Sequence, residues 1–160
     1  MKKVLIIEDD KVLSKMYALK LKKAGFDVWE AENWLEGLTT ISEFEPDVIL
    51  LDLMMPTMNG FETLQAIKNQ TSLTSKIIIF TNVVDKEKIE EAMNWWADEY
   101  LIKANVDPSD VIDAINRVLE KAGKDAQNPN AIEINPGLNI FKIKNPVNGE
   151  DIEISVNVKI

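Results

Sequence analysis

The sequence contains no cysteine and no histidine among its 160 residues. Without cysteine, the chain can form neither disulfides nor thiolate metal sites. Without histidine, it lacks the commonest general base and the commonest transition-metal ligand. Any metal that it binds should therefore be a hard cation held by oxygen atoms.

Basic residues are also scarce relative to acidic ones. The chain has 18 lysines and arginines against 27 aspartates and glutamates, which gives a net charge of -9. Domains that bind the phosphate backbone usually carry a basic face. We therefore expect no nucleic-acid partner.

Long hydrophobic runs are missing as well. The apolar run near the N-terminus covers only residues 4–7, too short for a signal peptide, and acidic residues follow it at once. No stretch approaches the roughly 20 apolar residues that a membrane helix needs. We expect no membrane partner and a cytoplasmic protein, large enough for one globular domain with an extension.

Short apolar runs alternate with segments of helical periodicity over about the first 122 residues. The apolar runs predict strands over residues 3–7, 26–31, 48–52, 76–81 and 99–102. The segments between them predict helices over residues 11–24, 34–44, 61–69, 86–96 and 108–122. We expect Asp10 to be the N-cap of the first helix rather than a metal ligand, Asp107 to cap the last, and Gly123 to end it. Strict alternation of this kind predicts an α/β fold with a doubly wound parallel sheet.

Charged or polar side chains stand at the ends of four predicted strands. Glu8 and Asp9 follow the first strand, Asp52 ends the third, Thr81 ends the fourth, and Lys103 follows the fifth. Ligands bind such sheets beyond the carboxyl ends of the strands, so we expect these groups to converge. Acidic groups brought together there repel one another, and their pKa values rise unless a cation compensates them. The pattern therefore predicts a site that binds a divalent metal and handles phosphate.

The character of the chain changes after Gly123. Residues 124–130 are polar and linker-like, and residues 131–160 predict a β-rich extension. Residues 138–145 and 151–160 read as two strands joined by a turn at Asn148-Gly149. A lone hairpin must bury its apolar face, so we expect it to cover a tryptophan-bearing surface or to form a homodimer contact.

The ordered motifs of residues 1–123 resemble those of the response-regulator receiver domain. The resemblance lies in Glu8-Asp9, in Asp52-Leu53-Met54-Met55-Pro56 with Gly60, in Thr81, and in Tyr100-Leu101-Ile102-Lys103. It implies a flavodoxin-like, five-stranded parallel sheet of order 2-1-3-4-5. It also implies a phosphoacceptor of a two-component phosphorelay, which takes phosphate and slowly loses it but is not a metabolic enzyme.

The resemblance assigns the acidic residues to phosphate acceptance and metal binding. Asp52 would be the phosphoacceptor, its carboxylate oxygen attacking a phosphoryl group to form an acyl phosphate. Mg²⁺ would be bound directly by Asp9, through a water by Glu8, by Asp52 itself, and by the backbone carbonyl of Met54.

Two further roles are implied for the other strand-end residues. Lys103 would pair with a phosphoryl oxygen, and the Thr81 hydroxyl would donate to another. As a switch, Thr81 would move toward the phosphoryl group while Tyr100 changes its burial. The surface of the fourth helix, fifth strand and fifth helix would then report the state to a downstream protein partner or a homodimer. The implied phosphate source is a sensor histidine kinase or a phosphotransfer protein.

The sequence departs from the family at two places. Ala104 follows Lys103 where the family commonly has a proline after a cis peptide bond, and the sequence leaves open whether the bond here is cis. Trp96 stands where the family usually has glycine; it either forms part of a contact surface or caps the end of a helix.

Three alternatives remain at this level. The unusual tryptophans and tail also fit a degenerate or engineered receiver used as a scaffold. A phosphatase of the haloacid-dehalogenase type needs a second aspartate two positions after its nucleophile, where this chain has Met54. A flavodoxin-like flavin carrier needs phosphate-binding donors after the first strand, where residues 8–10 are acidic and would repel the phosphate.

Overall fold

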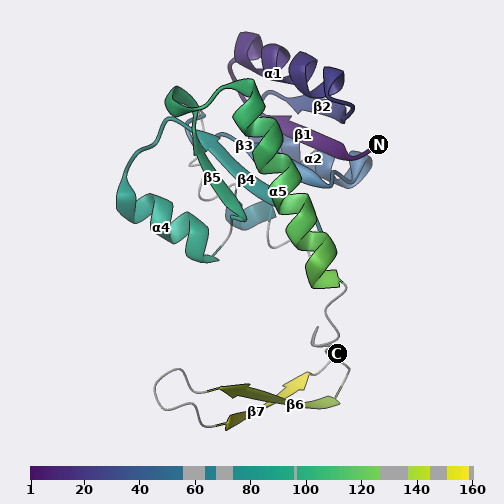
Figure 1. Cartoon of the computed structure of the whole chain (residues 1–160), viewed down its shortest axis with the longest axis vertical. Helices are drawn as coiled ribbons and strands as arrows, with labels where there is room; N and C mark the ends of the chain where they lie inside the picture. The colour runs from purple at the N-terminus through teal and green to yellow at the C-terminus, as the bar shows by residue number, and fades with distance from the viewer. Residues whose placement is uncertain (56–63, 68–73, 96, 127–136, 145–150, 159–160) are drawn as a thin grey trace. The chain divides into compact units, whose positions relative to one another are not determined.

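The computed structural model describes the chain except for residues 56–63, 68–73, 96, 127–136, 145–150 and 159–160 (Figure 1). The contacts within the chain divide it into two compact units, Met1–Lys124 and Asp125–Ile160. The motif residues Pro56 and Gly60, Trp96 and the turn at Asn148-Gly149 lie outside the described residues.

The first unit is built on a five-stranded parallel sheet of order β2-β1-β3-β4-β5. Its strands are β1 (Lys3–Ile7), β2 (Asp27–Ala31), β3 (Val48–Leu51), β4 (Lys76–Thr81) and β5 (Glu99–Ile102). This confirms the predicted doubly wound α/β fold and its flavodoxin-like strand order. All four residues of β3 are buried, as expected for an apolar strand covered on both faces.

The sheet is flanked by α1 (Lys11–Lys23), α2 (Trp34–Phe44), α4 (Lys86–Trp95) and α5 (Pro108–Ala126). Residues 64–67 are also helical; the rest of the helix predicted over residues 61–69 lies outside the described residues. The prediction that Gly123 ends the last helix is wrong, because α5 continues to Ala126. A glycine inside a helix costs about 1 kcal/mol relative to alanine, which is too little to force an end.

The two faces of the sheet carry separate apolar cores. On one face, α1 and α5 pack against β1, β3 and β4, and Figure 1 shows α5 crossing in front of the sheet. On the other face, α2, α4 and residues 64–67 cover the alternate side chains of the same strands. Glu8, Asp52 and Lys103 directly follow β1, β3 and β5, and Thr81 is the last residue of β4, so these polar residues lie at the carboxyl ends of the strands.

Two helix starts are fixed by aspartates, as predicted. The Asp10 carboxylate accepts hydrogen bonds from the backbone N–H groups of Val12 and Leu13, each at 3.0 Å. Asp107 accepts from the backbone N–H of Ser109 at 2.7 Å in the first turn of α5. Each carboxylate satisfies N–H groups that have no partner within the helix.

The second unit contains the antiparallel pair β6 (Gly137–Lys144) and β7 (Asp151–Val158). The register runs from Gly137 opposite Val158 to Lys144 opposite Asp151. The predicted β-hairpin extension is therefore present, with strand limits within two residues of those expected.

Candidate functional site

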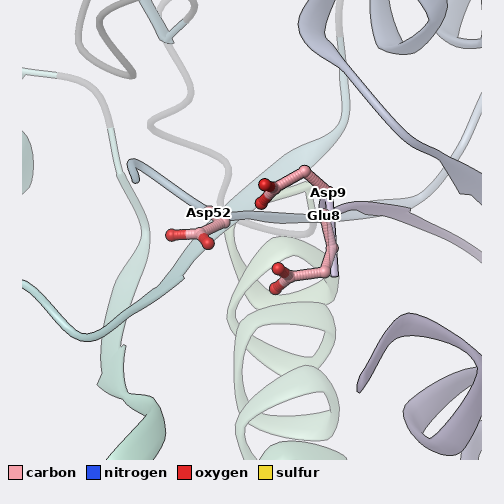
Figure 2. Close-up of side chains that lie close together, drawn as sticks. All are labelled: Glu8, Asp9 and Asp52. Carbon is pink, nitrogen blue, oxygen red and sulfur yellow. The ribbon is translucent and has the colours of Figure 1, made fainter. Parts of the chain in front are cut away.

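The carboxylates of Glu8, Asp9 and Asp52 each place one oxygen within 4.8 Å of the other two (Figure 2). Adjacent strands produce this arrangement, because β1 and β3 pair in register up to their last residues and the Asp52 N–H donates to the Ile7 carbonyl at 3.0 Å. Glu8 is only 3% exposed and Asp52 only 4%, whereas Asp9 is more accessible. The structure thus brings together the three acidic residues singled out in the sequence.

Lys103 joins this acidic group from the end of β5, where it begins the short 3-10 helix η1 (Lys103–Asn105). Its Nζ donates to Asp52 Oδ2 at 2.6 Å and also contacts Glu8 Oε2. The Lys103 side chain is 10% exposed. The peptide bond before Ala104 is trans, so the lysine reaches the carboxylates without the cis bond that the family commonly has.

Burial and charge together shift the pKa values of this group. Burial raises the pKa of Glu8, because the carboxylate loses hydration; the Lys103 ammonium opposes that shift and the nearby Asp52 charge adds to it. Burial alone would lower the pKa of Lys103, but its bonds to Asp52 and Glu8 outweigh this and raise it. The lysine therefore stays protonated, and its ammonium contacts two of the three carboxyl groups.

The donor set fits a hard divalent cation. All three side chains offer carboxylate oxygens, the ligands that Mg²⁺ prefers. Met54 lies beside them: its backbone N–H donates to Asp52 Oδ1 at 2.9 Å, while its side chain is 65% exposed. The Met54 side chain thus turns to solvent, and only its backbone adjoins the acidic group.

Thr81 and Tyr100 lie on the neighbouring strands. The Thr81 side chain is fully buried, and its hydroxyl has no hydrogen-bond partner among the residues that the structure describes. The Tyr100 hydroxyl donates to the Val83 carbonyl at 2.8 Å. Burial, together with the charges of Asp52 and Asp85, raises the pKa of Tyr100 to about 12. A buried hydroxyl without a hydrogen-bond partner is rare in proteins, so the Thr81 hydroxyl is a candidate donor to a bound ligand.

The double pairing of Lys103 with Asp52 and Glu8 was not predicted from the sequence. The sequence did contain a signal for this pairing. A lysine at a strand end opposite two buried carboxylates should pair with them when no other cation does. Phe80 was not singled out in the sequence either; its ring centroid lies 5.6 Å from Lys103 Nζ.

Comparison with known proteins assigns this site to a family. Residues 4–116 match the response regulator receiver domain. The chain is 31% identical over 156 residues to the response regulator ArlR of Staphylococcus aureus, covering 97% of this chain and 68% of ArlR. It is 30% identical over 119 residues to the DNA-binding dual master transcriptional regulator RpaA of Synechocystis, covering 74% of this chain and 48% of RpaA.

Solved structures agree with the sequence match. A CheY-like receiver domain protein from Methanospirillum hungatei superposes with a TM-score of 0.71 at 29% identity, covering 78% of this chain and 98% of that one. The chemotaxis protein CheY4 of Vibrio cholerae gives 0.68 at 31% identity, covering 74% of this chain and 98% of its own. The match is thus to a receiver rather than to a flavin carrier or a dehalogenase-type phosphatase.

The comparisons overturn one prediction, that the chain has no nucleic-acid partner. RpaA is a DNA-binding regulator. The inference failed because net charge is a sum over the whole chain and did not predict what a related regulator binds. The chain spans about half the length of RpaA and about two thirds of ArlR.

A second prediction was that the chain has no membrane partner. Among the residues that the structure describes, no helix is long and apolar enough to cross a membrane. The expected cytoplasmic location stays a prediction.

The family match, the fold and the strand-end residues agree. The chain belongs to the response regulator receiver domain family of two-component signalling systems.

Proposed function

We propose that this receiver accepts a phosphoryl group on Asp52 in a reaction that requires Mg²⁺. The observation that carries the proposal is the setting of the Asp52 carboxylate. It is 4% exposed, shares a 4.8 Å cluster with two other acids, and touches the Lys103 ammonium. A nucleophile of this kind needs charge neutralisation and positioning more than it needs a general base.

Asp9 and Asp52 would hold the ion directly, Glu8 would act through a water, and the Met54 carbonyl would complete the protein ligands. When bound, Mg²⁺ supplies neutralisation of the negative charge between the carboxylates and the incoming phosphoryl group. The buried Glu8 carboxyl supports this arrangement. Burial raises its pKa and the nearby Asp52 charge adds to that rise, and a divalent cation would favour the ionised form.

The transfer step uses the groups at three strand ends. An Asp52 carboxylate oxygen attacks the phosphorus, a new O–P bond forms, and the bond from phosphorus to the donor's leaving group breaks. Lys103 then pairs with a phosphoryl oxygen in place of the carboxylate that it contacts at 2.6 Å in this structure. The Thr81 hydroxyl, which has no partner among the described residues, donates to another phosphoryl oxygen.

The phosphoryl group would act on the protein through Thr81 and Tyr100. Drawing the Thr81 hydroxyl toward the acyl phosphate changes the space next to Tyr100, whose hydroxyl is tied to the Val83 carbonyl after β4. Breaking or keeping that bond gives two arrangements of the surface formed by α4, β5 and α5. The phosphoryl group would bias the equilibrium between them and so switch a protein–protein interaction surface.

The test is phosphorylation by a small acyl phosphate. Wild-type protein incubated with acetyl phosphate and Mg²⁺ should gain one phosphoryl group by intact-mass measurement, and EDTA should prevent the gain. Asp52→Asn should gain none. Asp47→Asn is the matched control, since Asp47 flanks the other end of β3 and bonds to Lys2 at 2.7 Å, far from the acidic cluster; it should label like wild type.

Equal labelling of Asp52→Asn and wild type would disprove the site. Absence of labelling in the wild type, with the fold intact by circular dichroism, would favour the alternative of a degenerate or engineered receiver without signalling activity.

A further inference from the structure

Lys103 has a third neighbour besides the two carboxylates. Its Nζ lies over the ring of Phe80, 5.6 Å from the ring centroid. Phe80 stands on β4 directly before Thr81, and the register places it opposite Leu101 of β5, two residues before the lysine. An ammonium within about 6 Å of an aromatic face is attracted by the negative charge density of that face.

The Phe80 ring is held in place by the core. It is 3% exposed and packs edge-to-face with Tyr17 of α1, with centroids 4.8 Å apart and ring planes at 79°. Tyr17 is itself 5% exposed. The ring therefore forms a fixed surface beside the Lys103 ammonium, in addition to the two carboxylates that the ammonium contacts.

The three partners of Lys103 differ in what a bound cation does to them. Once a divalent ion neutralises Glu8 and Asp52, their attraction for the ammonium weakens and the ion itself repels it. The phenyl ring is uncharged and offers no oxygen to the ion, so its attraction for the ammonium remains. Phe80 is the one partner of the three that keeps its hold when the carboxylates are occupied.

We propose that Phe80 is a positioning residue that keeps the Lys103 ammonium beside Asp52 while the phosphoryl group arrives. The proposal rests on the function proposed above and adds a residue to it. In this role Phe80 would act only through the lysine. Its removal should slow phosphorylation without removing any of the groups that carry out the reaction.

The first test is a double-mutant cycle on the rate constant for phosphorylation by acetyl phosphate at saturating Mg²⁺. Phe80→Leu should lower the rate constant about 5- to 30-fold, corresponding to about 1–2 kcal/mol. In a Lys103→Met background the same change should alter the rate constant by less than about twofold, because the ring then has no ammonium to hold. An equal loss in both backgrounds, or no loss in either, would overturn the proposal.

Phe44→Leu is the matched control for the loss of a buried ring. Phe44 is 4% exposed, and Lys3 Nζ lies over its ring at 5.3 Å, but this pair is formed at the opposite end of β1. We expect Phe44→Leu to lower stability while leaving the rate constant within about twofold of wild type. A fall as large as that in Phe80→Leu would show that general destabilisation is responsible and would contradict the proposal.

A second measurement does not depend on phosphorylation. Ring currents from Phe80 should shift the ε-methylene protons of Lys103 upfield in the NMR spectrum of the Mg²⁺-loaded chain. The assignment comes from Lys103→Arg, and Phe80→Leu should abolish the shift. If Mg²⁺ returns these protons to the position of exposed lysines, the ring does not hold the ammonium and the proposal fails. If the wild type takes up no phosphate but the shift persists, the proposed function fails while the placement of the lysine by Phe80 stands.

Discussion

Replacing Lys103 by methionine tests how much the Lys103 ammonium stabilises the buried carboxylates of Glu8 and Asp52. The side chain of Lys103 is 10% exposed, and the side chains of its partners Glu8 and Asp52 are 3% and 5% exposed. Methionine fills a similar volume but leaves the two carboxylates without a counter-charge. Removing one partner of a buried ion pair typically costs about 3–5 kcal/mol. We expect a loss of about 3 kcal/mol in the free energy of unfolding at pH 7 in EDTA.

Mg²⁺ should restore much of that loss. With the ammonium gone, a divalent ion no longer competes with it, so Lys103→Met should bind Mg²⁺ more tightly than wild type. A ligand present at 100 times its dissociation constant stabilises the folded state by about 2.7 kcal/mol. The difference in stability between variant and wild type should therefore shrink when EDTA is replaced by Mg²⁺.

The assay is urea unfolding followed by far-ultraviolet circular dichroism, with and without Mg²⁺. Lys76→Met is the control, because Lys76 pairs with Asp98 at 3.0 Å and both side chains are about one quarter exposed. Its loss should cost no more than about 1 kcal/mol and should not respond to Mg²⁺. If the two variants lose equal stability, or if Mg²⁺ leaves the Lys103→Met deficit unchanged, the account of the cluster is wrong.

Three further predictions concern pH, packing and the tyrosine bond. Burial raises the pKa of Glu8 above its ordinary 4.5, so its contribution to stability is full below pH 4.5 and is lost as pH rises through the raised pKa. Glu8→Gln should remove this pH-dependent contribution to the free energy of unfolding. The measurement compares urea unfolding of the variant and the wild type at pH 4.5 and pH 7. Gly37→Ala should cost about 1–2 kcal/mol despite the better helix former, since the new Cβ would lie 2.7 Å from Ile7 Cδ1, and a gain in melting temperature would contradict this. Tyr100→Phe should cost about 1 kcal/mol by losing the bond to the Val83 carbonyl, and alkaline titration at 295 nm should show the wild-type Tyr100 ionising near pH 12.

The fold could be predicted because local signals all agreed. The buried strands are near-continuous apolar runs, the helices show periodic apolar residues, and Asp10 and Asp107 mark two helix starts that the structure confirms. The end of α5 could not be predicted in the same way. A glycine signals a stop only when the chain turns there, and Gly123 instead keeps helical geometry.

The composition of the acidic cluster could also be predicted, because strand-end residues of a parallel sheet must converge. The network of contacts around Lys103 could not be predicted from the sequence. The approach of its ammonium to Asp52, Glu8 and the Phe80 ring depends on side-chain rotamers and on the backbone after β5, where the family's usual proline is absent. The nucleic-acid prediction failed for another reason: composition is summed over this chain and does not describe what a related regulator such as RpaA binds.

The function proposed for this chain depends on the binding of one divalent cation by the carboxylates of Glu8, Asp9 and Asp52. Titration of the chain with Mg²⁺, followed by tryptophan fluorescence and isothermal calorimetry, tests it most directly. We expect one ion per chain in the wild type and a loss of affinity of at least about tenfold in Asp9→Asn, which removes one of the three carboxylates. Wild-type protein that shows no Mg²⁺ binding, or an Asp9→Asn variant that binds as tightly as wild type, would contradict it.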